Sequence, residues 1–134
     1  MTAGTTGTTG YALSDLHSQI ETRINAKDLD GILAMFSAEA SMIDQDRAVW
    51  TGKDAIRQQI AGTLASAGKM TIRTRYAVAC GDLALLSNDW TLQVGDGQAS
   101  GTTCQVARRQ PDGSWLFLID YPFAADGPET PESS

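Results

Sequence analysis

The chain has 134 residues, a formal net charge of −6 and a hydrophobic content of 42%. This length predicts a single domain with one core. The acidic balance argues against nucleic acid and anionic membranes as partners, because both are bound through basic patches. No stretch approaches the roughly 20 apolar residues that a membrane span requires.

The cysteine and histidine content gives no indication of a metal site. Cys80 and Cys104 are far apart in the sequence and lack metal-ligand spacing, and the chain has one histidine. We therefore expect no metal and no cofactor. Both cysteines fall in predicted strands, where buried reduced thiols are favoured over a disulfide, which indicates a cytoplasmic protein.

The first half of the chain shows the apolar spacing of helices. Residues 1–11 are rich in threonine and glycine and predict a flexible leader. A first helix is expected over residues 12–26, a second short helix after a cap at Asp28, and a third from Gly52 to a stop at Gly68. Their buried faces are predicted to carry Leu13, Leu16, Ile20 and Ile24, then Leu29, Ile32, Leu33 and Phe36, then Ile56, Ile60 and Leu64.

The second half of the chain has the pattern of strands. A short strand is expected over residues 40–44, with a loop over residues 45–50. Glycine-containing turns then separate longer strands, which predicts a four-stranded antiparallel meander. These four strands are expected at residues 71–80, 83–94, 99–110 and 115–123. The acidic segment 124–134 contains two prolines and predicts a disordered tail.

This order of elements predicts an α+β fold over residues 12–123. Strands of ten or more residues do not stay flat, so the sheet is expected to curl. A bent, mostly antiparallel sheet with three N-terminal helices across its concave side forms a cone that encloses a pocket. Its convex side still needs a cover.

The last strand is apolar on both faces, which indicates that both faces are covered. The helices can cover one face, and a second copy of the chain is expected to cover the other, so we predict a homodimer. Strict alternation places Trp115, Phe117, Ile119 and Tyr121 on one face and Leu116, Leu118 and Asp120 on the other.

Asp120 is the only formal charge between Trp115 and Phe123. A carboxylate in an apolar wall is costly unless it is paired or used, so Asp120 is a candidate site residue. The alternative is a structural acid that is hydrogen-bonded to backbone before Pro122.

Three stretches resemble the nuclear transport factor 2-like superfamily, which includes the ketosteroid isomerases and the SnoaL-like polyketide cyclases. They are residues 28–36, residues 52–57, and residues 108–115 with the strand that follows. The resemblance extends over residues 12–123. It implies a cone-shaped fold with a pocket for a small apolar molecule, of polyketide or steroid type.

The resemblance to the ketosteroid isomerases also implies roles for individual residues. Their catalytic aspartate falls on Asp44, which would act as a general base. Their oxyanion-binding tyrosine falls on Ile20, which cannot donate a hydrogen bond, and their second oxyanion-binding group falls on Gln105, which can. The same alignment turns Leu116, Leu118 and Asp120 toward the cavity. Half of the oxyanion hole is therefore missing, and steroid isomerisation by that mechanism is not predicted.

Other residues are candidates for ligand contact. His17 lies one turn before Ile20 and is a candidate replacement for the missing tyrosine, the alternative being a satisfied, partly buried side chain. Met42, Tyr76 and Trp90 are candidate cavity walls, the alternative being plain core. Asp44 has the alternative of a turn-forming residue beside Gln45.

The sequence predicts a small-molecule pocket protein. If it is an enzyme, Asp44 and Asp120 would be the catalytic pair of a cofactor-independent isomerase, cyclase or hydratase, because two carboxylates in one cavity push their pKa values apart. The alternatives are a non-catalytic ligand-binding module and a protein-interaction module.

Overall fold

The computed structural model describes residues 11–124 as an α+β fold. Tyr11 already belongs to the folded part, because it forms an isolated bridge with Trp115. The rest of the expected leader and tail lies outside the described residues. The helices are η1 (Leu13–Asp15), α1 (Leu16–Asn25), α2 (Leu29–Leu33) and α3 (Lys53–Ser66), and the strands are β1 (Phe36–Ile43), β2 (Val49–Thr51), β3 (Ala67–Cys80), β4 (Leu83–Val94), β5 (Gly97–Arg109) and β6 (Trp115–Tyr121).

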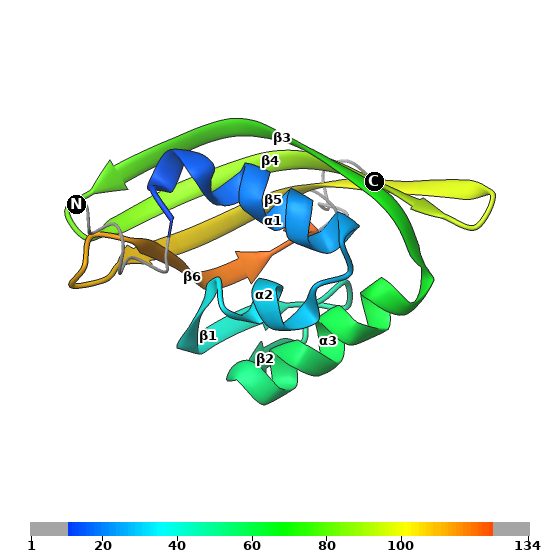
Figure 1. Ribbon diagram of the computed structural model, residues 1–134, viewed down its shortest axis with the longest axis horizontal. Helices are drawn as coiled ribbons and strands as arrows, with labels where there is room; N and C mark the ends of the chain where they lie inside the picture. Colours follow the sequence, from blue (N-terminus) through cyan, green and yellow to red (C-terminus); the bar gives the residue numbers. More distant parts are fainter. Residues whose placement is uncertain (1–10, 125–134) are drawn as a thin grey trace, which may run out of the picture.

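The six described strands form one curled sheet in the order β2-β1-β6-β5-β4-β3. Strands β3 to β6 are the predicted antiparallel meander. Strand β1 joins this meander by pairing parallel with β6. The sheet curls around α1 without closing, while α2 and α3 lie at its β1–β2 end (Figure 1). The cone-like α+β architecture predicted from the sequence is therefore confirmed.

The helices form where the apolar spacing predicts them. Asp28 caps α2, accepting a hydrogen bond from the Gly31 amide at 3.0 Å. The concave side of the sheet and these helices share one core, in which the rings of Phe36 and Phe117 lie 5.4 Å apart. The buried helix residues are Leu16, His17, Ile20, Ile32, Leu33, Ile56, Ile60 and Leu64.

Several predicted boundaries were wrong. Part of the expected loop over residues 45–50 belongs to β2, and β3 begins at Ala67 and not at residue 71. Phe36 belongs to β1 and not to the second helix, because it pairs with Phe117 of β6. Gly68 does not stop the third helix. It lies inside β3, where a Cβ atom would come within 3.0 Å of the Gln93 side chain on β4, so this position suits a residue without a side chain.

The face assignment of the last strand was also wrong, because β6 contains a bulge. Ala107 of β5 pairs with Phe117, but the next β5 residue pairs with Ile119, so Leu118 is the extra residue. The bulge reverses the alternation. Phe117 and Asp120 are therefore both buried, whereas Ile119 is 39% exposed.

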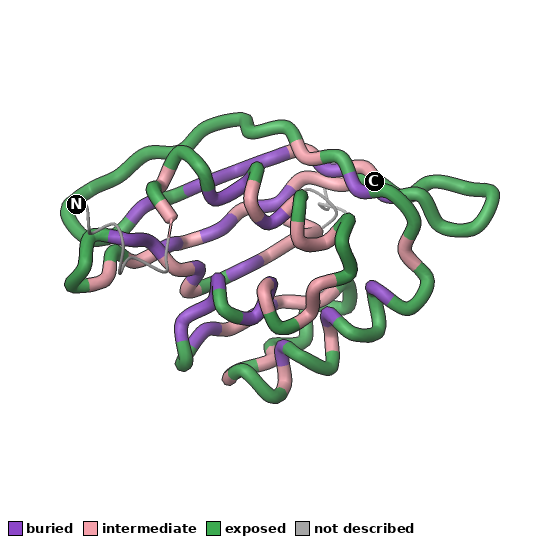
Figure 2. Tube along the Cα trace, in the orientation of Figure 1, coloured by how far each residue is buried: buried purple, intermediate pink, exposed green. Residues whose placement is uncertain are grey.

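Strand β3 is exposed along most of its length (Figure 2). Strand register and burial place most of the large exposed apolar residues on the convex side of the sheet, namely Tyr76, Val78, Leu83, Leu85 and Ile119. Cys80 is exposed at the end of β3, so the expectation of two buried thiols was wrong for this residue, and Cys104 is half-buried. Over residues 11–124, no helix has the length and apolar character needed to cross a membrane.

Candidate functional site

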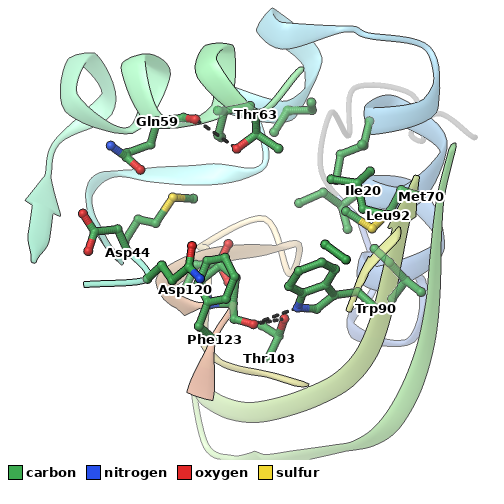
Figure 3. A pocket seen from close by; sticks show the side chains of 18 of the residues that line it. Ile20, Asp44, Gln59, Thr63, Met70, Trp90, Leu92, Thr103, Asp120 and Phe123 are labelled. Carbon is green, nitrogen blue, oxygen red and sulfur yellow. Dashed lines mark hydrogen bonds between the residues drawn. The ribbon is translucent and has the colours of Figure 1, made fainter. Parts of the chain in front are cut away.

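A cavity of about 460 Å³ lies between the concave side of the sheet and the helices (Figure 3). This volume is in the range of small-molecule sites. The residues around it come from all three α-helices and from strands on both sides of β6. Most of its wall is apolar and is formed by Ile20, Ile24, Ile32, Phe36, Met42, Ile60, Leu64, Met70, Ile72, Trp90, Leu92 and Phe123.

Of the polar side chains that line the cavity, four are buried in the sheet and are here called the polar patch: Asn88, Thr103, Gln105 and Asp120. They adjoin one another on the sheet, because Asn88 pairs with Thr103 and Gln105 pairs with Asp120. All four are buried. Met42, an apolar wall residue, pairs with Asp120 from the β1 side.

Asp120 reaches the cavity because of the β6 bulge. Without the extra residue, a strand that buries Phe117 would turn Asp120 toward the convex side. The bulge returns Asp120 to the concave side, between Met42 of β1 and Gln105 of β5. The sequence and the structure both place Asp120 at the cavity. The prediction from the sequence reaches this position by strict alternation of faces along the strand, which the bulge at Leu118 interrupts.

The carboxyl group of Asp120 is held in an unusual environment for an acid. It is 6% exposed, and its Oδ1 atom has no hydrogen-bond partner within the described part of the chain. Burial raises the pKa of Asp120 from 3.8 to about 7, while a hydrogen bond from Gln105 acts in the opposite direction. Near neutral pH this carboxyl can therefore both give and take a proton.

Gln105 is linked in turn to the only histidine of the sequence. Nε2 of His17 lies 2.7 Å from Oε1 of Gln105, and Nδ1 lies 2.7 Å from the hydroxyl oxygen of Thr74. His17 is 5% exposed, and burial lowers the pKa of its ring below 6.5. Both ring nitrogens are engaged within the protein. His17 does not line the cavity and does not replace the missing tyrosine as a ligand contact.

Asp44 lines the same cavity, but its carboxylate is used by its own loop. Oδ1 accepts hydrogen bonds from the amides of Asp46 and Ala48, at 2.8 and 2.9 Å, and Oδ2 accepts one from Nε1 of Trp50 at 2.9 Å. These bonds lower the pKa of Asp44, with Trp50 as the largest cause. The carboxylate points away from Asp120 (Figure 3). The geometry favours the turn-forming role over that of a general base.

The other predicted wall residues divide into two groups. Met42 and Trp90 line the cavity, whereas Tyr76 and Leu118 are not among its lining residues. Tyr76 is 37% exposed on β3, and Leu118 is the bulged residue of β6. Sequence reasoning missed Asn88 and Thr103, although alternation from Trp90 and Gln105 along their strands places both on the concave face.

Trp90 fixes one side of the cavity. Its Nε1 donates a hydrogen bond to the carbonyl oxygen of Pro122 at 2.7 Å, and its ring meets that of Phe123 edge-on at 5.5 Å (Figure 3). Gly101 lies opposite Trp90 on β5. A Cβ atom at this position would come within 2.8 Å of the indole, so the glycine leaves room for the ring.

No cluster of three or more His, Cys, Asp or Glu side chains that could hold a metal ion occurs across residues 11–124. Asp44 and Asp120 are the titratable side chains among the residues that line the cavity. The chemistry that the described site offers is therefore hydrogen bonding and proton exchange at the polar patch.

Comparison with known proteins agrees with this architecture. The family model for the SnoaL-like domain matches residues 18–117. The chain therefore belongs to the SnoaL-like family, within the nuclear transport factor 2-like superfamily. A comparison with curated proteins gives no match.

Solved structures support the same fold. A ketosteroid isomerase-like protein from Erwinia carotovora atroseptica is 15% identical, with a TM-score of 0.69 over 82% of this chain and 91% of that chain. A nuclear transport factor 2-like protein of unknown function from Pseudomonas putida is 22% identical, with a TM-score of 0.70 over 90% and 87% of the two chains. One from Shewanella oneidensis is 15% identical, with a TM-score of 0.70 over 81% and 93%. At these identities the likeness establishes the fold alone.

Proposed function

We propose that this protein binds a small, largely apolar and uncharged molecule in the cavity and exchanges a proton with it through Asp120. The observation that carries the proposal is the buried Asp120 carboxyl, which lines a largely apolar cavity, has a pKa of about 7 and has an Oδ1 atom without a hydrogen-bond partner among residues 11–124. A hydroxyl group on the ligand suits this atom, because it can donate to a carboxylate and accept from a carboxylic acid.

The charge of the cavity supports an uncharged ligand. The residues described as lining it include two carboxylates, Asp44 and Asp120, and no lysine, arginine or histidine. An anionic ligand would have to desolvate its charge beside a carboxylate with no cation to compensate. Anions such as fatty acids are therefore poor candidates.

The acid–base role follows from the same carboxyl. As a carboxylate, Asp120 accepts a proton from a ligand carbon or from water, and as a carboxylic acid it returns that proton to another atom. Proton shifts, cyclisation and hydration all require such a transfer. In this proposal Asp120 replaces Asp44 as the base, because the Asp44 carboxylate is held by its own loop.

Binding is tested with three probes that share one skeleton: adamantanol, its methyl ether and adamantanecarboxylate. Backbone amide shifts of Trp90 and Gln105 report on binding at about pH 8, where an acid of pKa about 7 is ionised. The alcohol should bind at least about tenfold more tightly than the ether, because the ether cannot donate a hydrogen bond to Asp120. The carboxylate should bind most weakly.

Matched variants identify the carboxyl that is responsible. Asp120→Leu should remove the preference for the alcohol over the ether, whereas Asp44→Asn, at the other carboxylate that lines the cavity, should keep it. If the carboxylate probe binds as tightly as the alcohol, the uncharged-ligand proposal is wrong. If none of the three probes binds, the pocket function itself is wrong.

The second candidate function is a non-catalytic ligand-binding module. It is favoured because the Asp44 carboxylate is held by its own loop, so only Asp120 is left for acid–base chemistry. Incubation with decalone in heavy water distinguishes a catalyst from a binding module. An acid–base catalyst should remove an α-hydrogen of the bound ketone and return deuterium from Asp120, and Asp120→Asn should abolish this exchange. A binding module should leave the ketone unlabelled.

A further inference from the structure

We infer that His17 is a positioning residue that acts on Asp120 through Gln105. The inference rests on the proposed role of Asp120 at the cavity, but it concerns His17, which lies behind the cavity wall. His17 belongs to α1, and Gln105 and Asp120 are cross-strand partners on β5 and β6. Helix and sheet are thereby joined by buried polar side chains beside the apolar core.

The contacts of the imidazole ring determine where its proton lies. The nearest partner of Nε2 is Oε1 of Gln105, at 2.7 Å, and an amide oxygen can only accept a hydrogen bond. Nε2 therefore carries the ring proton. Nδ1 then accepts a hydrogen bond from the Thr74 hydroxyl at 2.7 Å. Because burial lowers the pKa of His17, the ring is neutral at neutral pH and this is its single tautomer.

This tautomer fixes the orientation of the Gln105 side chain. With its oxygen held by His17, the amide nitrogen of Gln105 faces Asp120, where its hydrogen bond lowers the pKa of that carboxyl. A rotated amide would turn its oxygen toward the carboxylate and raise the pKa instead. His17 thus keeps Gln105 acting as a donor beside Asp120.

Asn88 defines the competing arrangement. Its Nδ2 atom lies 3.2 Å from the same Nε2 of His17. If Asn88 donated to this nitrogen, the ring proton would move to Nδ1, and Oε1 of Gln105 would face a lone pair. We favour the first arrangement because the contact with Gln105 is shorter, and the tautomer of His17 distinguishes the two.

The first test uses the unmodified protein. His17 is the only histidine in the sequence, so the nitrogen NMR spectrum of the untagged protein contains one imidazole. We expect a neutral ring with its proton on Nε2 at about pH 7. A proton on Nδ1, or a ring that is charged at that pH, would overturn the inference.

The second test follows the carboxyl carbon of Asp120 by NMR titration. Gln105→Leu should shift the pKa of Asp120 upward, because it removes the donor. His17→Phe should cause a similar upward shift, and the double variant should show little more than either single change. His17→Gln, which offers an amide donor near the position of Nε2, should restore most of the wild-type value.

These outcomes separate a positioning role from a structural one. If His17→Phe folds and leaves the titration of Asp120 unchanged, or if its shift adds fully to that of Gln105→Leu, the inference is wrong. Asp44 must be assigned in the same spectra, because it is the other titratable side chain lining the cavity. None of these measurements needs a ligand. The positioning role of His17 can therefore be wrong while the proposed function is right, and the proposed function can be wrong while the positioning role is right.

Discussion

At the scale of single residues, Asp120 should make the stability of the protein depend on pH. The pKa of Asp120 is about 7 in the folded chain, whereas an ordinary aspartate, as in the unfolded chain, has a pKa of 3.8. The folded state therefore holds this proton more tightly than the unfolded state does. The contribution is fully present below pH 3.8 and is lost as pH rises through about 7. Its size is up to about 4 kcal/mol in the free energy of unfolding.

The variant Asp120→Asn should remove this dependence. Relative to wild type, its free energy of unfolding should rise by up to about 4 kcal/mol between about pH 4 and about pH 8, as measured by urea denaturation. Asp44→Asn is the matched control. The pKa of Asp44 is lowered below 3.8, so its own contribution changes only near the acid end of this range, and its substitution should change the free energy of unfolding by nearly the same amount at both pH values. Equal pH dependence in wild type and Asp120→Asn would contradict the buried-acid description.

Residue-level reasoning from the sequence found Asp120, because a lone charge in an apolar strand is conspicuous. It could not find the bulge at Leu118, because nothing in a run of apolar residues indicates which residue lacks a partner on the neighbouring strand. It also assigned chemistry to Asp44, whose hydrogen bonds depend on how residues 44–50 fold back. The link from His17 to Gln105 joins residues 88 positions apart, which no local pattern reveals.

At the scale of elements, the pairing of β4 with β5 sets the width of the cavity beside Trp90. We expect Gly101→Ala to displace the indole, because the new Cβ would lie within 2.8 Å of the ring. The hydrogen bond from Trp90 to Pro122 should then weaken. A crystal structure of the variant should show a moved indole and a reshaped cavity.

Gly62→Ala provides a control for this substitution, because a Cβ atom there meets no atom within 4 Å and the glycine lies in a helix. This variant should leave Trp90 in place. An unmoved indole in Gly101→Ala would show that the cavity wall does not depend on the glycine.

Most elements could be predicted, because apolar spacing and glycine turns are local signals. Strand β4 begins and ends as predicted, and the helix faces carry the expected residues except Phe36, which belongs to β1. The early start of β1 at Phe36 could not be predicted, because the parallel pairing with β6 that extends it joins segments far apart in the sequence.

At the scale of the whole molecule, the exposed convex face fits the predicted homodimer. Val78, Leu85, Val106 and Ile119 form a continuous row of cross-strand neighbours from β3 to β6. Val78, Leu85 and Ile119 are 59%, 46% and 39% exposed. Contiguous apolar surface of this kind is typical of interfaces between identical subunits, where one patch can meet its own copy.

We therefore expect sedimentation to give about twice the chain mass of 14.2 kDa. Val78→Glu should shift the protein toward the monomer, because it places a charge in the row. Val49→Glu is the matched control, since Val49 is 64% exposed on β2, at the opposite edge of the sheet. A wild-type monomer at micromolar concentration would contradict the dimer.

The most direct test of the proposed function is a crystal structure of the protein with adamantanol. We expect the adamantane cage among the apolar walls of the cavity, with its hydroxyl oxygen about 2.7 Å from Oδ1 of Asp120. The opposite result would be a cavity that stays closed to the probe, or a bound probe whose hydroxyl avoids Asp120. Either would show that this carboxyl is a structural acid and not the group that contacts the ligand.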